Sequence, residues 1–368
     1  MASPSGGAAA GPDLTSHILD AARQAWPAFV LVSGLLLVGK AADADGLFES
    51  VGRRLEGWSR SPLALLATCI ALDVVVTATL NLDTAVVFLT PILVHAARAR
   101  GADETPFLYS AVFMANASSL YLPGSNLTNL LVSAHDPLGG GSAFAGHMIV
   151  PALTATVVTA FGLVAIFRSR LRRRSSQTAA AAAHKPPLVG AGAAAIAAAL
   201  TVVLGNPALA VLGVGLAAVA LQIARGRLQW RGAVRAVGPF TLAALFVAAV
   251  ALGVLARSWD GPSQLLASAG RWGTAGVGAL TAVAVNNLPA AVLLSAHRPA
   301  YPAALLIGLN LGPNLAVTGS LSALLWFRAA RSVAAKPSIR RYSLIGVVLA
   351  PLAIATALAA SVVLGSGP

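Results

Sequence analysis

Charged residues are scarce in this 368-residue chain, because Asp, Glu, Lys and Arg together make up only 10% of it. A soluble domain carries roughly 25% of such residues, whereas 57% of this chain is hydrophobic. These proportions exclude an ordinary soluble protein and indicate an integral membrane protein. Aromatic residues are also few, at 6%, while Ala, Leu, Val and Gly dominate, which is typical of closely packed membrane helices.

Cysteine is almost absent, since Cys69 is the only one. A single cysteine excludes an internal disulfide and a thiolate metal cluster, and its place in an apolar run favours a small core residue. The histidines show no metal-ligand spacing, and no P-loop, HExxH or GxSxG motif occurs. The sequence therefore predicts no metal, no cofactor and no enzymatic activity.

Acidic residues are half as frequent as basic ones, with 12 Asp and Glu against 25 Lys and Arg. The basic residues gather in short loops between apolar runs, at 53–60, 98–100, 168–174, 225–235 and 328–341. Such clusters mark the cytoplasmic loops of membrane proteins. The excess of positive charge therefore predicts an orientation in the lipid bilayer, and no nucleic-acid partner is expected.

The apolar runs predict an all-α integral membrane protein with about eight full spans, since roughly 20 residues cross a bilayer. The spans begin near residues 26, 106, 147, 187, 208, 239, 303 and 342. Two further segments, 62–97 and 273–295, have two apolar arms and a polar tip. We expect these two segments to be re-entrant hairpins.

Two polar stretches, residues 116–131 and 310–325, interrupt the spans that begin near 106 and 303. Each mixes Asn, Ser, Thr, Gly and Pro. Hydrocarbon offers no water, so a broken polar backbone survives only where it lines a cavity within the protein. Paired breaks in two halves of a membrane chain point to the substrate site of a transporter.

The two halves repeat. The first hairpin tip, from Asn81, aligns with the sequence from Asn287, and residues 125–128 align with 319–322. Five full crossings separate the corresponding helices at Pro27 and Pro239, and an odd number inverts the second half. We expect a disordered tail at 1–25, a first inverted repeat at 26–174, a linker at 175–186 and a second inverted repeat at 187–368.

The candidate solute-binding residues are amide and hydroxyl side chains at the hairpin tips and helix breaks, accompanied there by Asn129 and Ser322. They supply neutral donors and acceptors, beside half-helix N-termini that carry positive dipole ends. The alternative is that such residues only join helices, at about 0.6 kcal/mol each. The candidates are Asn81, Thr84, Asn116, Ser118, Ser119, Ser125, Asn126, Thr128, Asn286, Asn287, Asn310, Asn314, Thr318 and Ser320.

Two carboxylates, Asp73 and Asp83, lie within apolar runs. An aspartate at mid-helix costs about 3 kcal/mol on insertion scales and marks ion or proton pathways. We expect Asp83, at the first hairpin tip, to couple protons, with a helix cap as the alternative. Asp73 is a second candidate for proton coupling, or pairs with Lys40 or another polar group.

These motifs resemble those of bacterial arsenite efflux permeases of the ArsB type, in the ion transporter superfamily. The resemblance rests on NLDTAVVFLTPI (81–92), MANASSLYLPGSNLTN (114–129), VNNLP (285–289) and LGPNLAVTGSLSALLW (311–326). It implies a multi-pass permease of the bacterial cytoplasmic membrane that exchanges arsenite or antimonite for protons. It further implies a homodimer and, in some members, a separate ATPase subunit. Relatives carry dicarboxylates, citrate or sulfate with sodium or protons.

The chain departs from this family at two points. Members have two more spans before the helix that Pro27 begins, and they have Asn-Asp-Gly where this chain has Asn81-Leu82-Asp83. The first repeat is therefore expected to be shorter by two spans, with the N-terminus outside.

Three hypotheses follow. Proton-driven efflux of neutral arsenous acid requires hydroxyl and amide partners, and neither polar stretch contains Lys or Arg. The alternative is a sodium- or proton-coupled carrier of a dicarboxylate, citrate or a sulfate-like anion. A non-transporting scaffold is the third, motivated by the missing spans.

Overall fold

The computed structural model describes residues 14–48, 50, 61–134, 141–172, 188–204 and 206–363. The expected linker at 175–186 lies outside the described residues. The described part of the chain is helical throughout and contains no strand. The protein is an all-helical membrane protein, as predicted.

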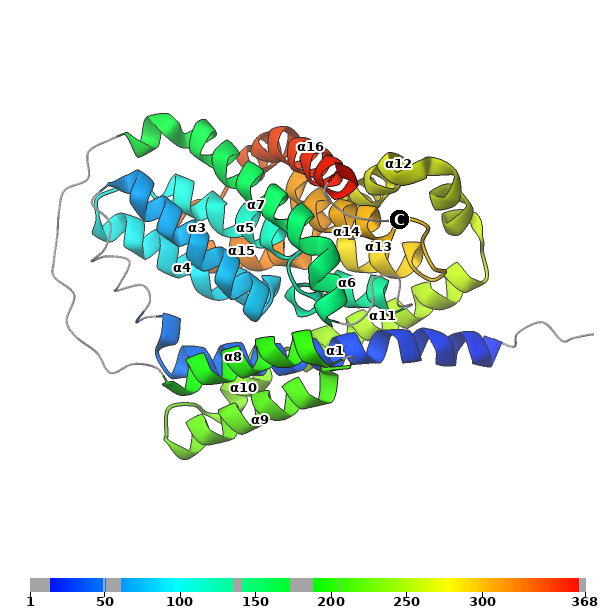
Figure 1. The fold of residues 1–368 in the computed structure, drawn as a ribbon. Coiled ribbons are helices and arrows are strands. Elements are labelled where there is room, and N and C mark those ends of the chain that lie inside the picture. The colour runs from blue at the N-terminus through cyan, green and yellow to red at the C-terminus, as the bar shows by residue number, and fades with distance from the viewer. Residues whose placement is uncertain are drawn as a thin grey trace, which may run out of the picture.

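A lower layer of helices in Figure 1 is organised around α1 (Leu14–Ala44). This helix packs against α8 (Leu188–Val203), α9 (Ala208–Ala224), α10 (Trp230–Val237) and α11 (Pro239–Arg257). At the centre of the layer, a Cβ atom on Gly34 would lie 2.7 Å from the backbone N of Leu212, and one on Gly215 would lie 2.6 Å from the Gly34 O. Because only glycine leaves room for this approach, the backbones of α1 and α9 are in direct contact.

The tail expected to be disordered is helical from Leu14 to the predicted start of the first span, so that expectation is wrong for residues 14–25. The helix runs through Pro27, which we expected near its start. Packing explains the extension: Ala21 and Ala25 are buried, and a Cβ atom on Gly253 of α11 would lie 2.9 Å from the Ala21 Cβ. Residues 1–13 lie outside the described part of the chain.

Asp45 fastens the end of α1 to the same layer. Its Oδ2 accepts hydrogen bonds from the backbone N of Val189 and of Gly190, both at 3.0 Å, and its Oδ1 accepts one from Arg227 at 2.7 Å. Burial raises the pKa of this carboxyl, but these hydrogen bonds and the charge of Arg227 outweigh burial and hold the pKa below its usual value. Asp45 is therefore ionised at neutral pH and caps the start of α8.

The upper layer of Figure 1 contains the two hairpins and the two broken helices. Its first-half elements are α3 (Pro62–Thr79), α4 (Leu82–Ala99), α5 (Thr105–Ser118), the 3-10 turn η1 (Pro123–Ser125), α6 (Leu127–Ser133) and α7 (Gly141–Leu171). Its second-half elements are α12 (Gly261–Val285), α13 (Asn287–Leu294), α14 (Pro302–Leu311), η2 (Gly312–Leu315), η3 (Val317–Gly319), α15 (Leu321–Ser332) and α16 (Ile339–Val363). The predicted hairpins and helix breaks are thus present, interrupted where Asn, Gly and Pro occur.

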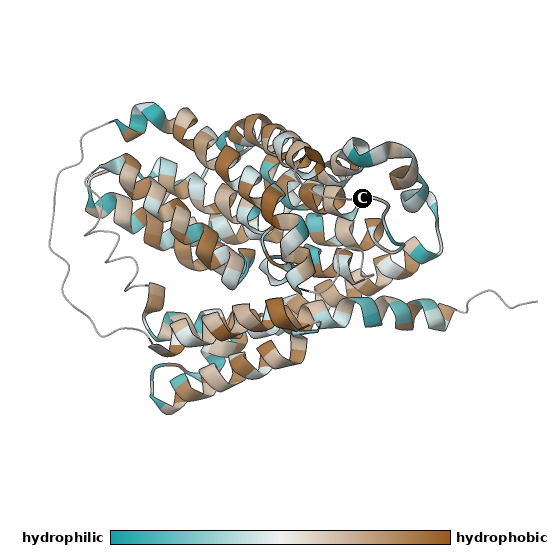
Figure 2. Ribbon diagram, viewed as in Figure 1, coloured by the Kyte–Doolittle hydropathy of each residue, from teal (hydrophilic) through white to brown (hydrophobic). Residues whose placement is uncertain are grey.

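Hydrophobic residues predominate along the helices (Figure 2), and large apolar side chains such as Phe161 and Phe240 are 72% and 87% exposed. Exposed apolar surface of this kind marks contact with a membrane or with another protein surface. Among the described residues, six helical segments are long and apolar enough to cross a membrane: α1, α3, α4, α7, α16 and the run Trp230–Arg257. Helices α8 and α9 are apolar but have only 16 and 17 residues. The count of eight full spans and the re-entrant path of the hairpins stay predictions.

Candidate solute-binding site

The two hairpin tips each carry an asparagine in an unusual backbone conformation. Asn81, between α3 and α4, has a φ of 155°, and Asn286, between α12 and α13, has a φ of 78°; L-residues rarely adopt such angles. Each side chain caps the next helix, Asn81 Oδ1 accepting from Thr84 N at 2.7 Å and Asn286 Oδ1 from Leu288 N at 3.3 Å. Asn81 therefore corresponds to Asn286, and its predicted alignment with Asn287, the buried first residue of α13, is wrong by one position.

The two helix breaks end in the same way. Asn126 before α6 and Ser320 before α15 both have a φ of −150°, and each side chain accepts a hydrogen bond from the first turn of the following half-helix. The donors are Thr128 N at 3.2 Å and Ala323 N at 3.3 Å. This equivalence confirms the predicted alignment of residues 125–128 with 319–322.

The two broken helices meet at Asn310, which is fully buried. Its Oδ1 accepts hydrogen bonds from Ser119 Oγ at 2.7 Å, from Asn126 Nδ2 at 2.6 Å and from Thr128 Oγ1 at 3.4 Å. Its Nδ2 donates to Asn129 Oδ1 at 2.9 Å. The polar residues of the two halves, almost two hundred positions apart in the sequence, therefore form one cluster. Both polar atoms of Asn310 are engaged by protein groups, so this side chain joins the two broken helices, and its predicted contact with a solute stays a prediction.

A second link joins Asn116 of α5 to Asn314 of η2. Asn116 Nδ2 donates to Asn314 Oδ1 at 2.7 Å, and Asn314 Nδ2 donates to the Phe113 O at 3.4 Å. Asn129 holds the two sides of the first helix break together. Its Nδ2 donates to the carbonyl oxygens of Ser119 at 2.7 Å and Leu122 at 3.0 Å, on the other side of the break.

Four buried polar atoms of the predicted site have no hydrogen-bond partner within the described residues. They are Asn81 Nδ2, Thr84 Oγ1, Asn116 Oδ1 and Ser118 Oγ. A buried polar group without a partner costs about 1–3 kcal/mol. These atoms are one donor, one acceptor and two hydroxyl groups that do both, which are the kinds of group that contact a small hydroxylated solute.

Other predicted residues lie apart from this cluster. Asn286 Nδ2 donates to the Thr318 O at 3.4 Å, and the exposed Thr318 donates from its hydroxyl to the Val283 O at 3.0 Å. Ser125 Oγ donates to the Ala78 O of α3 at 3.2 Å. The tip of the second hairpin is therefore hydrogen-bonded to the second helix break.

Asp83 bridges the first hairpin to the second broken helix, because Ser322 Oγ donates to its Oδ1 at 2.6 Å. The sequence placed Ser322 in the polar stretch but did not identify it as the partner of Asp83. Asp83 lies in the first turn of α4 and Ser322 in the first turn of α15, and a helix N-terminus interacts favourably with a negative charge.

Asp73 lies at mid-helix in α3 and is 1% exposed. Its Oδ1 accepts a hydrogen bond from Thr77 Oγ1 at 3.1 Å, while its Oδ2 has no partner in the described part of the chain. The suggested pairing with Lys40 is wrong, because Lys40 Nζ bonds to Asp43 at 2.5 Å, one turn along its own helix. In the described ranges, no group of three or more His, Cys, Asp or Glu could hold a metal ion.

Helices broken inside an apolar bundle, with amides of both halves meeting at the break, define a secondary membrane transporter. Comparison with known proteins identifies the family. The sequence profile described as "Citrate transporter" matches residues 6–315. The chain therefore belongs to the citrate transporter family, and it is not an enzyme.

Several relatives carry a function in their names. The arsenical pump membrane proteins of Escherichia coli K12 and Shigella flexneri are each 27% identical to this chain over 335 residues, covering 82% of this chain and 78% of the relative. The predicted resemblance to arsenite permeases is confirmed. The crystal structure of the YdaH transporter of Alcanivorax borkumensis has the same fold, with a TM-score of 0.60 and 16% identity over 96% of this chain and 88% of the other.

Proposed function

We propose that this transporter exports arsenite or antimonite across a bacterial cytoplasmic membrane in exchange for protons. The observation that carries the proposal is that four buried polar atoms, at Asn81, Thr84, Asn116 and Ser118, have no partner in the part of the chain that the structure describes. Arsenous acid is neutral at pH 7 and presents three hydroxyl groups, each of which both donates and accepts. Neutral amide and hydroxyl partners therefore match it without a fixed cation.

Asp83 is the proposed site of proton coupling. Its carboxylate accepts a hydrogen bond from Ser322 at 2.6 Å, so protonation changes the contact between the first hairpin and the second broken helix. Asp73, with one buried carboxylate oxygen lacking a partner in the described residues, is the second proposed coupling site. Carboxylates inside membrane proteins often mark proton pathways, because a carboxyl group can gain or lose a proton without moving.

The alternative is a carrier of citrate, a dicarboxylate or a sulfate-like anion, coupled to sodium or protons, and the family description favours it. In this case the oxygen atoms of Asn116, Thr84 and Ser118 would serve as sodium ligands, because amide and hydroxyl oxygens bind hard cations. The half-helix N-termini at Leu127 and Leu321 would then face the anion.

Flux measurements distinguish the alternatives. Everted vesicles that accumulate arsenite when a proton gradient is imposed, without ATP, support proton exchange by the carrier alone. A requirement for ATP would indicate the separate ATPase subunit of some relatives. Sodium-dependent citrate or dicarboxylate uptake into right-side-out vesicles supports the alternative. No flux of any of these solutes would favour a scaffold.

The proposed homodimer is tested by the mass of the purified carrier in detergent.

Ser118→Ala tests the site itself. The hydroxyl of Ser118 has no partner among the described residues, so its removal leaves stability unchanged or slightly raised, while solute flux falls. Ser110→Ala is the matched control, because Ser110 is also buried in α5 but donates to the Phe107 O at 2.9 Å. Normal flux in Ser118→Ala would contradict the proposed site.

A further inference from the structure

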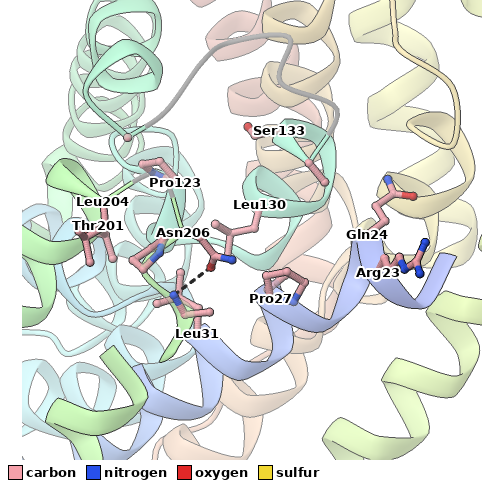
Figure 3. Close-up of a pocket in the computed structure, with 15 residues that line it drawn as sticks. Arg23, Gln24, Pro27, Leu31, Pro123, Leu130, Ser133, Thr201, Leu204 and Asn206 are labelled. Carbon is pink, nitrogen blue, oxygen red and sulfur yellow. Dashed lines mark hydrogen bonds between the residues drawn. The ribbon is translucent and has the colours of Figure 1, made fainter. Parts of the chain in front are cut away.

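A cavity of about 460 Å³ lies beside the first broken helix, outside the polar cluster. Figure 3 shows it between α1, α6 and the residues around the end of α8 and the start of α9, with Arg23 and Gln24 at one end and Thr201 and Asn206 at the other. Ligand sites typically occupy about 300–1,000 Å³. The cavity is therefore large enough for a small solute with part of its hydration shell.

The ends of the helices around the cavity show which side of the membrane it faces. It is lined by Gly141 at the start of α7 and by Ala208 at the start of α9. The opposite ends of these helices carry basic residues, Arg168 and Arg170 on α7 and Arg225 after α9. Arg23 and Arg257, which donates to Gln24 at 2.6 Å, lie at the cavity end. Because the larger basic clusters gather on the cytoplasmic side, the cavity lies toward the extracytoplasmic side.

Only a short turn separates the cavity from the polar cluster. Pro123 of η1 and Leu130 of α6 line the cavity, whereas Asn126, which lies between them, bonds to Asn310 at 2.6 Å. Between Pro123 and Asn126, a Cβ atom on Gly124 would lie 3.1 Å from Thr201 Cγ2. One turn of the broken helix, closed against Thr201, therefore forms the wall.

The lining also has groups that could contact a solute. Ser133 Oγ has no hydrogen-bond partner among the residues that the structure describes. Asn206 accepts a bond from Ala208 N at 3.3 Å, and Arg23 brings a cation, 3.8 Å from Asp20. These donors and acceptors suit an oxygen-rich solute, neutral or anionic.

We infer that this cavity is the extracytoplasmic vestibule of the carrier, through which a small oxygen-rich solute passes between the polar cluster and the outside. The inference rests on the proposed function. It assigns Ser133 to the path of the solute, and the contact of Gly124 with Thr201 to the closed wall of that path.

Labelling of single cysteines tests the vestibule. The background is Cys69→Ala, since Cys69 is the only cysteine and is buried. Ser133→Cys is compared with Gln229→Cys, an exposed position after α9 at the basic end of the bundle. A charged, membrane-impermeant methanethiosulfonate is applied to right-side-out and to everted vesicles. We expect Ser133→Cys to react from the extracytoplasmic side and Gln229→Cys only in everted vesicles.

Modification of Ser133→Cys should also slow flux of the carried solute, arsenite or citrate, severalfold, while modified Gln229→Cys keeps its flux. Reaction of Ser133→Cys only in everted vesicles, no reaction from either side, or full flux after modification would overturn the inference. The side of labelling needs no substrate. A protein that carries neither solute but reacts at Ser133→Cys from outside would therefore refute the proposed function and still support an outward-facing cavity.

Discussion

Asn310 provides the sharpest test of how the two halves are held together, because one side chain connects both broken helices. The perturbation is Asn310→Leu, which keeps an apolar side chain of similar size but removes every polar contact. Ser119 retains a second bond, from its Oγ to the Asn116 O at 2.8 Å. Three buried groups lose the only hydrogen-bond partner that they have among the described residues: Asn126 Nδ2, Thr128 Oγ1 and Asn129 Oδ1.

The magnitude follows from these three groups. A buried polar group left without a partner costs about 1–3 kcal/mol, so three such groups predict a loss of about 3–9 kcal/mol in the free energy of unfolding. The average of about 0.6 kcal/mol per hydrogen bond between membrane helices gives a similar lower limit when four bonds to Asn310 are lost.

The assay is the thermal unfolding midpoint of the purified full-length carrier in detergent. With an unfolding entropy of about 2.1 cal/mol/K per residue, the midpoint of a 368-residue chain shifts by about 1.3 °C per kcal/mol, so Asn310→Leu should melt at least about 3 °C below wild type. Thr154→Val is the control, because within the described residues Thr154 bonds to the Val150 O of its own helix, at 2.9 Å, and to no other element. A midpoint for Asn310→Leu as high as that of Thr154→Val would refute the assignment of Asn310 as the junction.

Three further predictions concern other contacts. Asp83→Asn should abolish the dependence of flux on the proton gradient, since an amide exchanges no proton; an unchanged pH profile would exclude Asp83 as the coupling site. Gly34→Leu should prevent recovery of monodisperse protein, because α1 and α9 are in backbone contact there, whereas Gly213→Leu, with open space around it, should be recovered normally. Asp45→Asn should lower the melting midpoint at pH 7. Because the pKa of Asp45 is lowered in the folded protein, its contribution to stability is present above about pH 4 and disappears as the pH falls through the lowered pKa. The melting midpoints of wild type and Asp45→Asn should therefore converge in acid. A difference that stays constant with pH would contradict this origin.

The breaks in the helices were predictable from the sequence, because Pro, Gly and Asn end helices for local reasons. Pro123 and the pair Gly312-Pro313 lie where the structure has 3-10 turns. That the two breaks lie together could be predicted from the repeat of the two halves. The register of the second hairpin could not be predicted, because Asn286 and Asn287 are adjacent and either can cap a helix.

Long-range packing explains the remaining differences. The helical start of α1 depends on burial of Ala21 against Gly253, more than two hundred residues away, and no local signal reports it. The contact between Asp83 and Ser322 likewise joins the first and second halves. Which of the many polar atoms lack protein partners, as Thr84 Oγ1 and Ser118 Oγ do within the described residues, can be learned only from three-dimensional structure.

The contact between Gly34 and Gly215 also limits which helices can move relative to one another. Two helices whose backbones touch cannot slide without separating, so α1 and α9 must travel as one body. Thr84 of the first hairpin meets α1 differently, because its side chain faces Gly39, where an added Cβ would lie 2.6 Å from Thr84 Cγ2. This contact is made by one side chain and a glycine, and not by two backbones. If the site faces the two sides of the membrane in turn, the relative movement takes place at the contact between α1 and the first hairpin.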